Sequence, residues 1–307
     1  MKKQKIKIAV ILTVLTIMSI NSTYGVKPGD RPHELSVYGS GGLSSFRYKL
    51  STSDVRNGIG SNFGVGYTYF FDSKIGAHIG AGLGMYSKKV NVNDFKVVSS
   101  DLIDNEGDRF NMHSTLFGYD ETQKAMFLNI PVMAIYEQYI GKRPVYAMGG
   151  FKTGIPLKGK YAATSTRLEN ASYYPEYDNW ATTQKFAGNG VFDGKEFDGD
   201  LKLGVSVMLA LEAGTKFNLY KDFSLYVGAF FDYGLNSVLK DKHRKFINYS
   251  ALDPSAFNAN LFSVPDKTNV IAAGVVLRVN FSIDNSTNPR KGRSVDKRIN
   301  PFGVLER

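Results

Sequence analysis

The stretch LKLGVSVMLALEAGTKFNL, residues 201–219, alternates between two kinds of side chain. Its odd positions are almost all apolar, whereas its even positions carry mainly lysine, glycine, serine, glutamate and asparagine. A period of two is typical of a β-strand, because successive side chains point to opposite faces of the sheet. The run is also far longer than the usual strand of roughly five or six residues. It therefore predicts a long strand with one apolar and one polar face.

Seven other segments alternate in the same way and bring the number of predicted strands to eight. Tight turns at 72–74, 140–143 and 220–222 alternate along the chain with long polar connections. In an antiparallel meander every second connection emerges at the same end, so one end should carry only tight turns and the other all the long loops. The seven segments are 34–49, 60–71, 75–88, 124–138, 144–157, 223–240 and 271–283, and the long connections are 50–59, 89–123, 158–200 and 241–269.

The two ends of the chain differ from this body. Residues 1–25 carry a lysine-rich start and then an apolar run too short to span a bilayer comfortably, which predicts a cleaved signal peptide rather than a membrane anchor. Residues 285–307 are basic and predict a disordered tail. Only +2 of the net charge of +10 falls in residues 26–284, so the charge predicts no nucleic-acid partner.

An exported chain with no later apolar helix and an even number of long strands is typical of a transmembrane up-and-down β-barrel. The alternative is a soluble secreted barrel. The polar face favours the membrane, because glycine, serine and asparagine suit a narrow packed lumen better than a water-facing exterior. Aromatic residues near the tight-turn end predict an interfacial girdle. They are Tyr67, Tyr69, Phe70, Phe71, Tyr136, Tyr139, Tyr146, Phe217, Tyr220, Phe223 and Phe281, and a second group near the long loops holds Phe46, Tyr48, Tyr86, Phe127, Phe151 and Tyr233.

The last predicted strand contains GVVLRVNF, residues 274–281, whose alternating apolar residues end on Phe281. It resembles the terminal assembly signal of eight-stranded outer-membrane barrels, the OmpA-like transmembrane domain family and its PorT-like relatives in Bacteroidetes. The resemblance covers about residues 34–283. It implies the outer membrane of a Gram-negative bacterium, with the barrel assembly machinery and membrane lipid as partners and a periplasmic tail. The chain departs from the family's simplest form because 26 residues follow Phe281.

Seven charged residues fall on the polar faces of the predicted strands and should meet inside the barrel. Opposite charges in a narrow lumen should pair, because an unpaired buried charge is very costly. Pairing favours a salt-bridge plug over a gated conduction path, since side chains just fill the interior of eight strands. The seven residues are Glu137, Lys152, Lys202, Glu212, Lys216, Asp232 and Arg278, with His78 nearby.

The long loops hold the candidates for binding. The segment SYYPEYDNW, residues 172–180, contains Tyr173, Tyr174, Tyr177 and Trp180. Exposed aromatic residues at this density bind sugars or proteins, or else pack on one another. Two acidic stretches, 104–108 and 193–200, lack the spacing of an EF-hand, so they predict turns and no metal site.

A lipid-modifying barrel enzyme would need a serine, a base and an orienting acid near the long-loop rim. The four histidines, at 33, 78, 113 and 243, lie in no such motif, and the chain has no cysteine, so we expect no catalytic site and no cofactor. The sequence predicts an all-β, eight-stranded antiparallel transmembrane barrel over residues 26–284, with short periplasmic turns and long extracellular loops. Its expected role is structural or a surface interaction with an extracellular ligand or partner protein. A narrow small-solute channel is the alternative.

Overall fold

A computed structural model describes residues 33–50, 54–141, 143–220, 223–240, 246–253 and 257–283. Most of these residues are in strands, and none of the helices in the described ranges has the length and apolarity needed to cross a membrane. The predicted signal peptide, residues 1–25, and the predicted tail, residues 285–307, lie outside the described residues.

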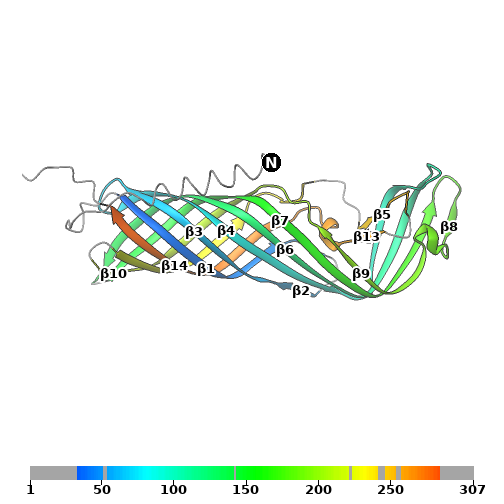
Figure 1. The fold of residues 1–307 in the computed structure, drawn as a ribbon, viewed down its shortest axis with the longest axis horizontal. Helices are drawn as coiled ribbons and strands as arrows, with labels where there is room; N and C mark the ends of the chain where they lie inside the picture. Colours follow the sequence, from blue (N-terminus) through cyan, green and yellow to red (C-terminus); the bar gives the residue numbers. More distant parts are fainter. Residues whose placement is uncertain are drawn as a thin grey trace, which may run out of the picture.

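Eight long antiparallel strands form the body of the protein (Figure 1). Each pairs with two others, and the pairings run in the order β1, β3, β4, β6, β7, β10, β11, β14 and back to β1. The predicted eight-stranded antiparallel barrel is confirmed. The strands are β1 (His33–Arg47), β3 (Ile59–Phe70), β4 (Ile75–Val92), β6 (Arg109–Ile140), β7 (Arg143–Tyr174), β10 (Ser206–Tyr220), β11 (Phe223–Gly234) and β14 (Asn269–Ile283).

The predicted phase of the strands is also confirmed. In β10, Met208 and Ala210 are buried while Val207 and Leu209 are exposed on the outer surface. Large apolar side chains are exposed in the same way around the ring, as lipid requires of an outer face. Two predicted strands are shorter than expected, since β10 begins at residue 206 and β11 ends at residue 234. The exposed apolar residues include Val37, Phe63, Ile79, Leu83, Val132, Phe151, Ile155, Leu211, Phe217, Phe231, Val275 and Leu277.

The aromatic residues divide differently from the prediction. Most of those near the tight turns are exposed, as a girdle requires, but Tyr146 is buried in the lumen and Phe70 is partly buried. In the second group, four residues point inward instead of toward lipid. The alternation of the strand sets the direction of each side chain. An aromatic residue at an inward position therefore fills the barrel, at any distance from the membrane surface. The four are Phe46, Tyr48, Tyr86 and Phe127.

The hairpin of β6 and β7 continues far beyond the barrel, with pairing from Ile140 and Arg143 to Asn111 and Tyr173. Additional strands pair along it and build a sheet at one end of the molecule (Figure 1). We call this the extracellular sheet, made of β5 (Phe95–Ile103), residues 109–124 of β6, residues 158–174 of β7, β8 (Asn179–Ala181) and β9 (Gly190–Asp200). A short strand, β2 (Asp54–Asn57), pairs with the end of β4.

The extracellular sheet corrects the prediction that 89–123 and 158–200 are loops. A period of two continues inside these segments, where Phe110, Met112 and Leu116 all point inward. Gly118, at φ 55°, then interrupts the alternation within β6. After it the inward positions are Tyr119 and every second residue that follows. A scan for uninterrupted alternation misses a strand whose phase changes partway.

In addition to the packed interior of the barrel, the protein has a second core, which is apolar. It fills the space between the extracellular sheet and the barrel mouth. Phe262 packs edge-on against Phe46 of β1, and Phe246 packs against Tyr119 of β6. These side chains are buried. The core is therefore part of a folded cap over the extracellular end. The cap segments are β12 (Ile247–Asn248), β13 (Asn258–Ala259) and the short 3-10 helix η3 (Leu261–Ser263), while a second such helix, η1 (Lys185–Ala187), precedes β9.

The first and last strands close the barrel along their full length, from the pair His33 and Ile283 to the pair Arg47 and Asn269. Gly42 and Gly274 stand opposite each other in this ladder. A Cβ atom on Gly274 would clash with the carbonyl oxygen of Gly41. Backbones this close leave no room for a side chain, so closure depends on glycine there.

We predict that Gly274→Ala destabilises the barrel by about 1–3 kcal/mol, the usual effect of overpacking. The measurement is the temperature at which the compact band of the unboiled protein converts to the unfolded band on a gel, which should fall. Gly149→Ala is the matched control, because its Cβ would meet Leu211 at an ordinary 3.5 Å. Equal conversion temperatures for the two variants would contradict the role of close approach in closure.

Candidate functional site

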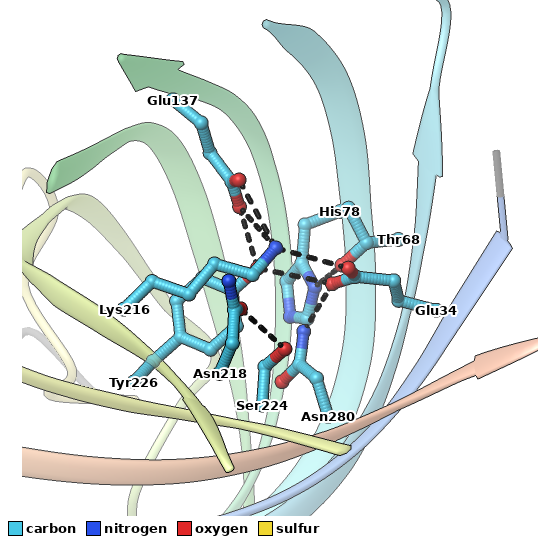
Figure 2. A network of polar contacts seen from close by, with 9 residues as sticks. All are labelled: Glu34, Thr68, His78, Glu137, Lys216, Asn218, Ser224, Tyr226 and Asn280. Carbon is cyan, nitrogen blue, oxygen red and sulfur yellow. Dashed lines mark hydrogen bonds and ion pairs between the residues drawn. The ribbon is translucent and has the colours of Figure 1, made fainter. Parts of the chain in front are cut away.

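Near the periplasmic turns, one lysine joins two carboxylates across the lumen (Figure 2). Lys216 Nζ lies 3.2 Å from Glu34 Oε1 and 3.1 Å from Glu137 Oε2. The Tyr226 hydroxyl donates to Glu137, its nearer acceptor, and lies 3.1 Å from Glu34 Oε2, while Asn280 Nδ2 donates to Glu34. These residues come from β1, β6, β10, β11 and β14. One polar cluster therefore ties together five of the eight barrel strands.

Deeper in the lumen, Arg278 forms the centre of a second cluster. Its Nη2 atom donates to both oxygens of Glu212, at 2.8 and 3.1 Å, and the Tyr146 hydroxyl donates to Glu212 at 3.0 Å. Arg278 Nη1 lies 2.9 Å from His78 Nε2. A guanidinium only donates, so His78 Nε2 accepts, and its Nδ1 carries the proton given to Thr68 Oγ1 at 2.9 Å. The cluster thus requires neutral His78.

A third pair lies nearer the extracellular end, where Lys152 Nζ is 2.6 Å from Asp232 Oδ2. The cavity lined by this pair, Arg278 and Tyr38 has a volume of about 20 Å³, measured as the space open to the centre of a water molecule. That is room for a water or two. Three levels of paired charges therefore fill the lumen, in line with the plug favoured by eight-strand geometry.

Six of the seven residues predicted for the lumen take part in these three clusters. They are Glu137, Lys152, Glu212, Lys216, Asp232 and Arg278. The prediction that Lys202 lies in the lumen is wrong, because Lys202 precedes β10 and its side chain is exposed. The alternating pattern around it belongs to an ordered connection, in which Leu203 bridges to Leu239 instead of continuing the strand.

The sequence analysis missed four partners in the lumen. Tyr226 falls on the same face as Asp232, so strand phase gave a usable signal for it. Glu34 and Asn280 also lie on inward positions, but near strand ends where alternation has few neighbours to support it. Tyr146 was assigned to the girdle because it is aromatic, although it pairs with inward Glu212.

We predict that Arg278→Met destabilises the folded barrel by roughly 3–5 kcal/mol, because it leaves Glu212 buried without its cation. The double variant Arg278→Met with Glu212→Gln should recover most of that loss, since neither charge remains. The measurement is the urea concentration at half-unfolding in detergent micelles. A double variant no more stable than the single one would show that the pair is not the stabilising unit.

Above the membrane-facing band, a buried carboxylate attaches the cap to the extracellular sheet. Glu121 accepts hydrogen bonds from the Tyr119 hydroxyl at 2.7 Å, Gln123 Nε2 at 2.6 Å and the Leu261 backbone N–H at 2.7 Å. Burial raises the pKa of Glu121 above its ordinary value, although these three donors oppose the shift. The nearby cation, Lys88, is buried separately and donates to the Phe46 carbonyl.

Because the folded-state pKa of Glu121 is raised, its contribution to stability is complete below the unfolded pKa and is lost as pH rises through the folded pKa. We predict that Glu121→Gln removes this loss. The stability advantage of the variant over the native chain should therefore grow from pH 4.5 toward pH 7. Trp180, the only tryptophan, reports unfolding of the extracellular sheet by its fluorescence. An advantage independent of pH would contradict the assignment.

At the tip of the extracellular sheet, three rings form what we call the tip platform: His113, Tyr173 and Trp180. The Trp180 ring centroid lies 4.9 Å from each of the other two, and its side chain is 50% exposed. The Tyr173 hydroxyl donates to Asp178 Oδ1 at 2.9 Å, which fixes the ring. The platform is therefore an ordered aromatic surface that faces solvent.

The other residues predicted in or near this loop lie elsewhere. Tyr174 points to the opposite face and stacks on Phe110 at 5.3 Å, in the second core. Tyr177 is exposed and donates its hydroxyl to Asp108 at 3.2 Å. The prediction could not separate Tyr173 from Tyr174, because only pairing with β6 and β8 shows which residue faces outward.

Other predicted features occupy structural positions. Phe281 lies on the outer surface and packs edge-on against Phe223 at 4.7 Å. His33 contacts the Tyr67 hydroxyl, while His243 lies outside the described residues. Asp104 Oδ1 accepts the backbone N–H groups of Glu106 and Asp108, so the acidic stretch 104–108 contains a turn, whereas 193–200 belongs to β9. In the described ranges, no three His, Asp or Glu side chains are grouped to hold a metal ion.

The family model described as "Outer membrane protein beta-barrel domain" matches residues 28–240. The chain belongs to this family. The protein therefore lies in the outer membrane of a Gram-negative bacterium, as predicted, with its turns toward the periplasm and its extracellular sheet outside the cell. The finer kinship with PorT-like proteins stays a prediction. Among curated proteins, none matches the chain.

Several solved structures are similar in fold. OprG from Pseudomonas aeruginosa is 14% identical with a TM-score of 0.38, covering 83% of this chain and 98% of its own. Neisserial surface protein A (NspA) is 10% identical with a TM-score of 0.31, covering 85% and 100%. Ail of Yersinia pestis, solved with the heparin analogue sucrose octasulfate, is 15% identical with a TM-score of 0.28, covering 81% and 97%.

Proposed function

We propose that this outer-membrane barrel is a surface-interaction protein whose tip platform binds a carbohydrate outside the cell. The observation that carries the proposal is the exposed ring group of His113, Tyr173 and Trp180 on an ordered sheet. The barrel has the structural role of anchoring that sheet in the membrane.

The platform has the chemistry that a sugar ring requires. The apolar face of a pyranose packs on an aromatic ring, and the indole of Trp180 gives the largest such surface. Polar groups surround it, since Asp178 lies beside Tyr173 and Asn111 is the cross-strand neighbour of Tyr173. These side chains can bond sugar hydroxyls around the stacked face. Because the rings already contact one another, binding would order few new side chains.

The lumen supports an anchoring role better than the alternative of a channel. The three charged clusters cross the interior at successive levels, and the cap covers its extracellular end with buried Phe246 and Phe262. A solute would have to break paired buried charges and displace an apolar core in turn. Each step is energetically costly.

The test uses the purified full chain in detergent micelles on an immobilised panel of neutral and acidic oligosaccharides. We predict that the native chain is retained and that Trp180→Ala weakens binding by about 30-fold, as expected for a hot-spot aromatic residue worth roughly 2 kcal/mol. Phe186→Ala is the control, since Phe186 in η1 is an aromatic residue even more exposed than Trp180, at 77% against 50%. The proposal fails if no sugar retains the chain, or if Trp180→Ala binds as tightly as the control.

A further inference from the structure

On one side of the barrel, the apolar outer band ends directly below a group of lysines. Met85 of β4 stands opposite Met126 of β6, which stands opposite Lys158 of β7. Two residues further along β6, Lys124 stands opposite Lys160. All three lysines are exposed. Alternation along β6 turns Lys124 outward, and Lys158 and Lys160 share that face as the cross-strand neighbours of Met126 and Lys124.

Two more cations extend this group across the neighbouring strands. Lys89 of β4 is exposed two positions above Ser87, the cross-strand neighbour of Lys124. Arg56 of β2 is the exposed cross-strand neighbour of Lys89. We call these five residues the rim cation cluster: Arg56, Lys89, Lys124, Lys158 and Lys160.

Carboxylates border the cluster, but in the described residues none forms an ion pair with it. Asp120 lies nearby, but its carboxylate accepts from Asn91 at 2.6 Å. Asp200 of β9 is the cross-strand neighbour of Lys160. In the described part of the chain, no carboxylate lies within 4.0 Å of a cationic nitrogen of the cluster. Like charges directly opposite each other destabilise a sheet. An external anion bound between Lys124 and Lys160 would reduce this repulsion.

The opposite side of the rim is built differently. There Arg47 of β1 donates to the Tyr233 hydroxyl at 2.6 Å and stacks over its ring at 5.4 Å. Just before β10 and just after β11, Val205 and Leu235 are exposed apolar residues. Arg56, Lys89, Lys124, Lys158 and Lys160 therefore lie side by side over β2, β4, β6 and β7.

We propose that the rim cation cluster binds the phosphate groups of a lipid in the outer leaflet. Headgroup phosphates lie immediately above the hydrocarbon. Lys158 is level with Met126, and Lys124 and Lys160 are two positions above it, so these lysines lie at that height. The acyl chains would pack on those methionines and on exposed Leu157. Several ammonium groups around one phosphorylated headgroup supply charge-assisted hydrogen bonds. This site is separate from the tip platform and does not depend on carbohydrate binding.

The test measures binding of bisphosphorylated lipid A, and of the same lipid after removal of its phosphates, to the full chain in neutral detergent by native mass spectrometry. We expect tighter binding of the phosphorylated lipid. Lys124→Gln with Lys160→Gln should weaken that binding about 25-fold, since each lysine near an anionic surface contributes roughly fivefold. The dephosphorylated lipid should bind the native chain and this variant equally.

The matched control is Lys96→Gln with Lys185→Gln, which removes two exposed lysines from outside the rim. It should bind the phosphorylated lipid as the native chain does, and Lys124→Arg with Lys160→Arg should retain binding. The heat-dependent gel shift verifies that each variant is folded. Equal affinity of the native chain for the two lipids would overturn the proposal, as would undiminished phosphate-dependent binding by the folded glutamine variant. Loss in the Lys96 and Lys185 control would also overturn it, because net charge alone would then explain binding.

Discussion

Backbone pairing in lipid is the constraint on which the rest of this structure depends. No water is present in the hydrocarbon to hydrogen-bond a free sheet edge, so the strands must close into a ring. Closure here joins β1 to β14, where two glycines let the backbones meet. A ring of eight strands fixes a narrow interior, and alternation then divides every strand between lipid and lumen. The polar interior follows from the same geometry that makes the exterior apolar.

The narrow interior explains why the charged residues occur as connected clusters. Lys152, Lys216 and Arg278 are each placed against at least one carboxylate, and phenol or amide groups take up further bonding positions. Such a network fixes strand register, because a shift of one residue would turn its members toward lipid. It also leaves space for little more than isolated water. The filled lumen therefore supports the proposed anchoring role over that of a passage.

The two surfaces that we propose as binding sites lie at the boundaries of the barrel wall. Beyond the membrane, β6 and β7 continue as a hairpin and carry a second core of their own, which holds the tip platform in place. At the membrane edge, the same two strands and β4 carry the rim cation cluster. One continuous pair of strands thus connects a surface suited to sugar with a surface suited to phosphorylated lipid. The lumen stabilises both without taking part in either.

The sequence by itself determined the barrel, because a period of two and the order of short and long connections are local properties that eight strands repeat. It also determined six of the lumen charges, since strand phase alone places Glu212 and Arg278 on the inner face. Tertiary structure decided which charges pair, because partners such as Glu34 and Lys216 are 182 residues apart. It also decided that the predicted loops are strands, since their inward residues become a core only when residues 246–253 and 257–264, distant in sequence, cover them. Lys202 and Tyr146 show two limits of predicting side-chain direction from sequence. At Lys202 the alternating pattern continues although the strand does not. Tyr146 points into the lumen because its position in the strand, and not its aromatic character, sets its direction.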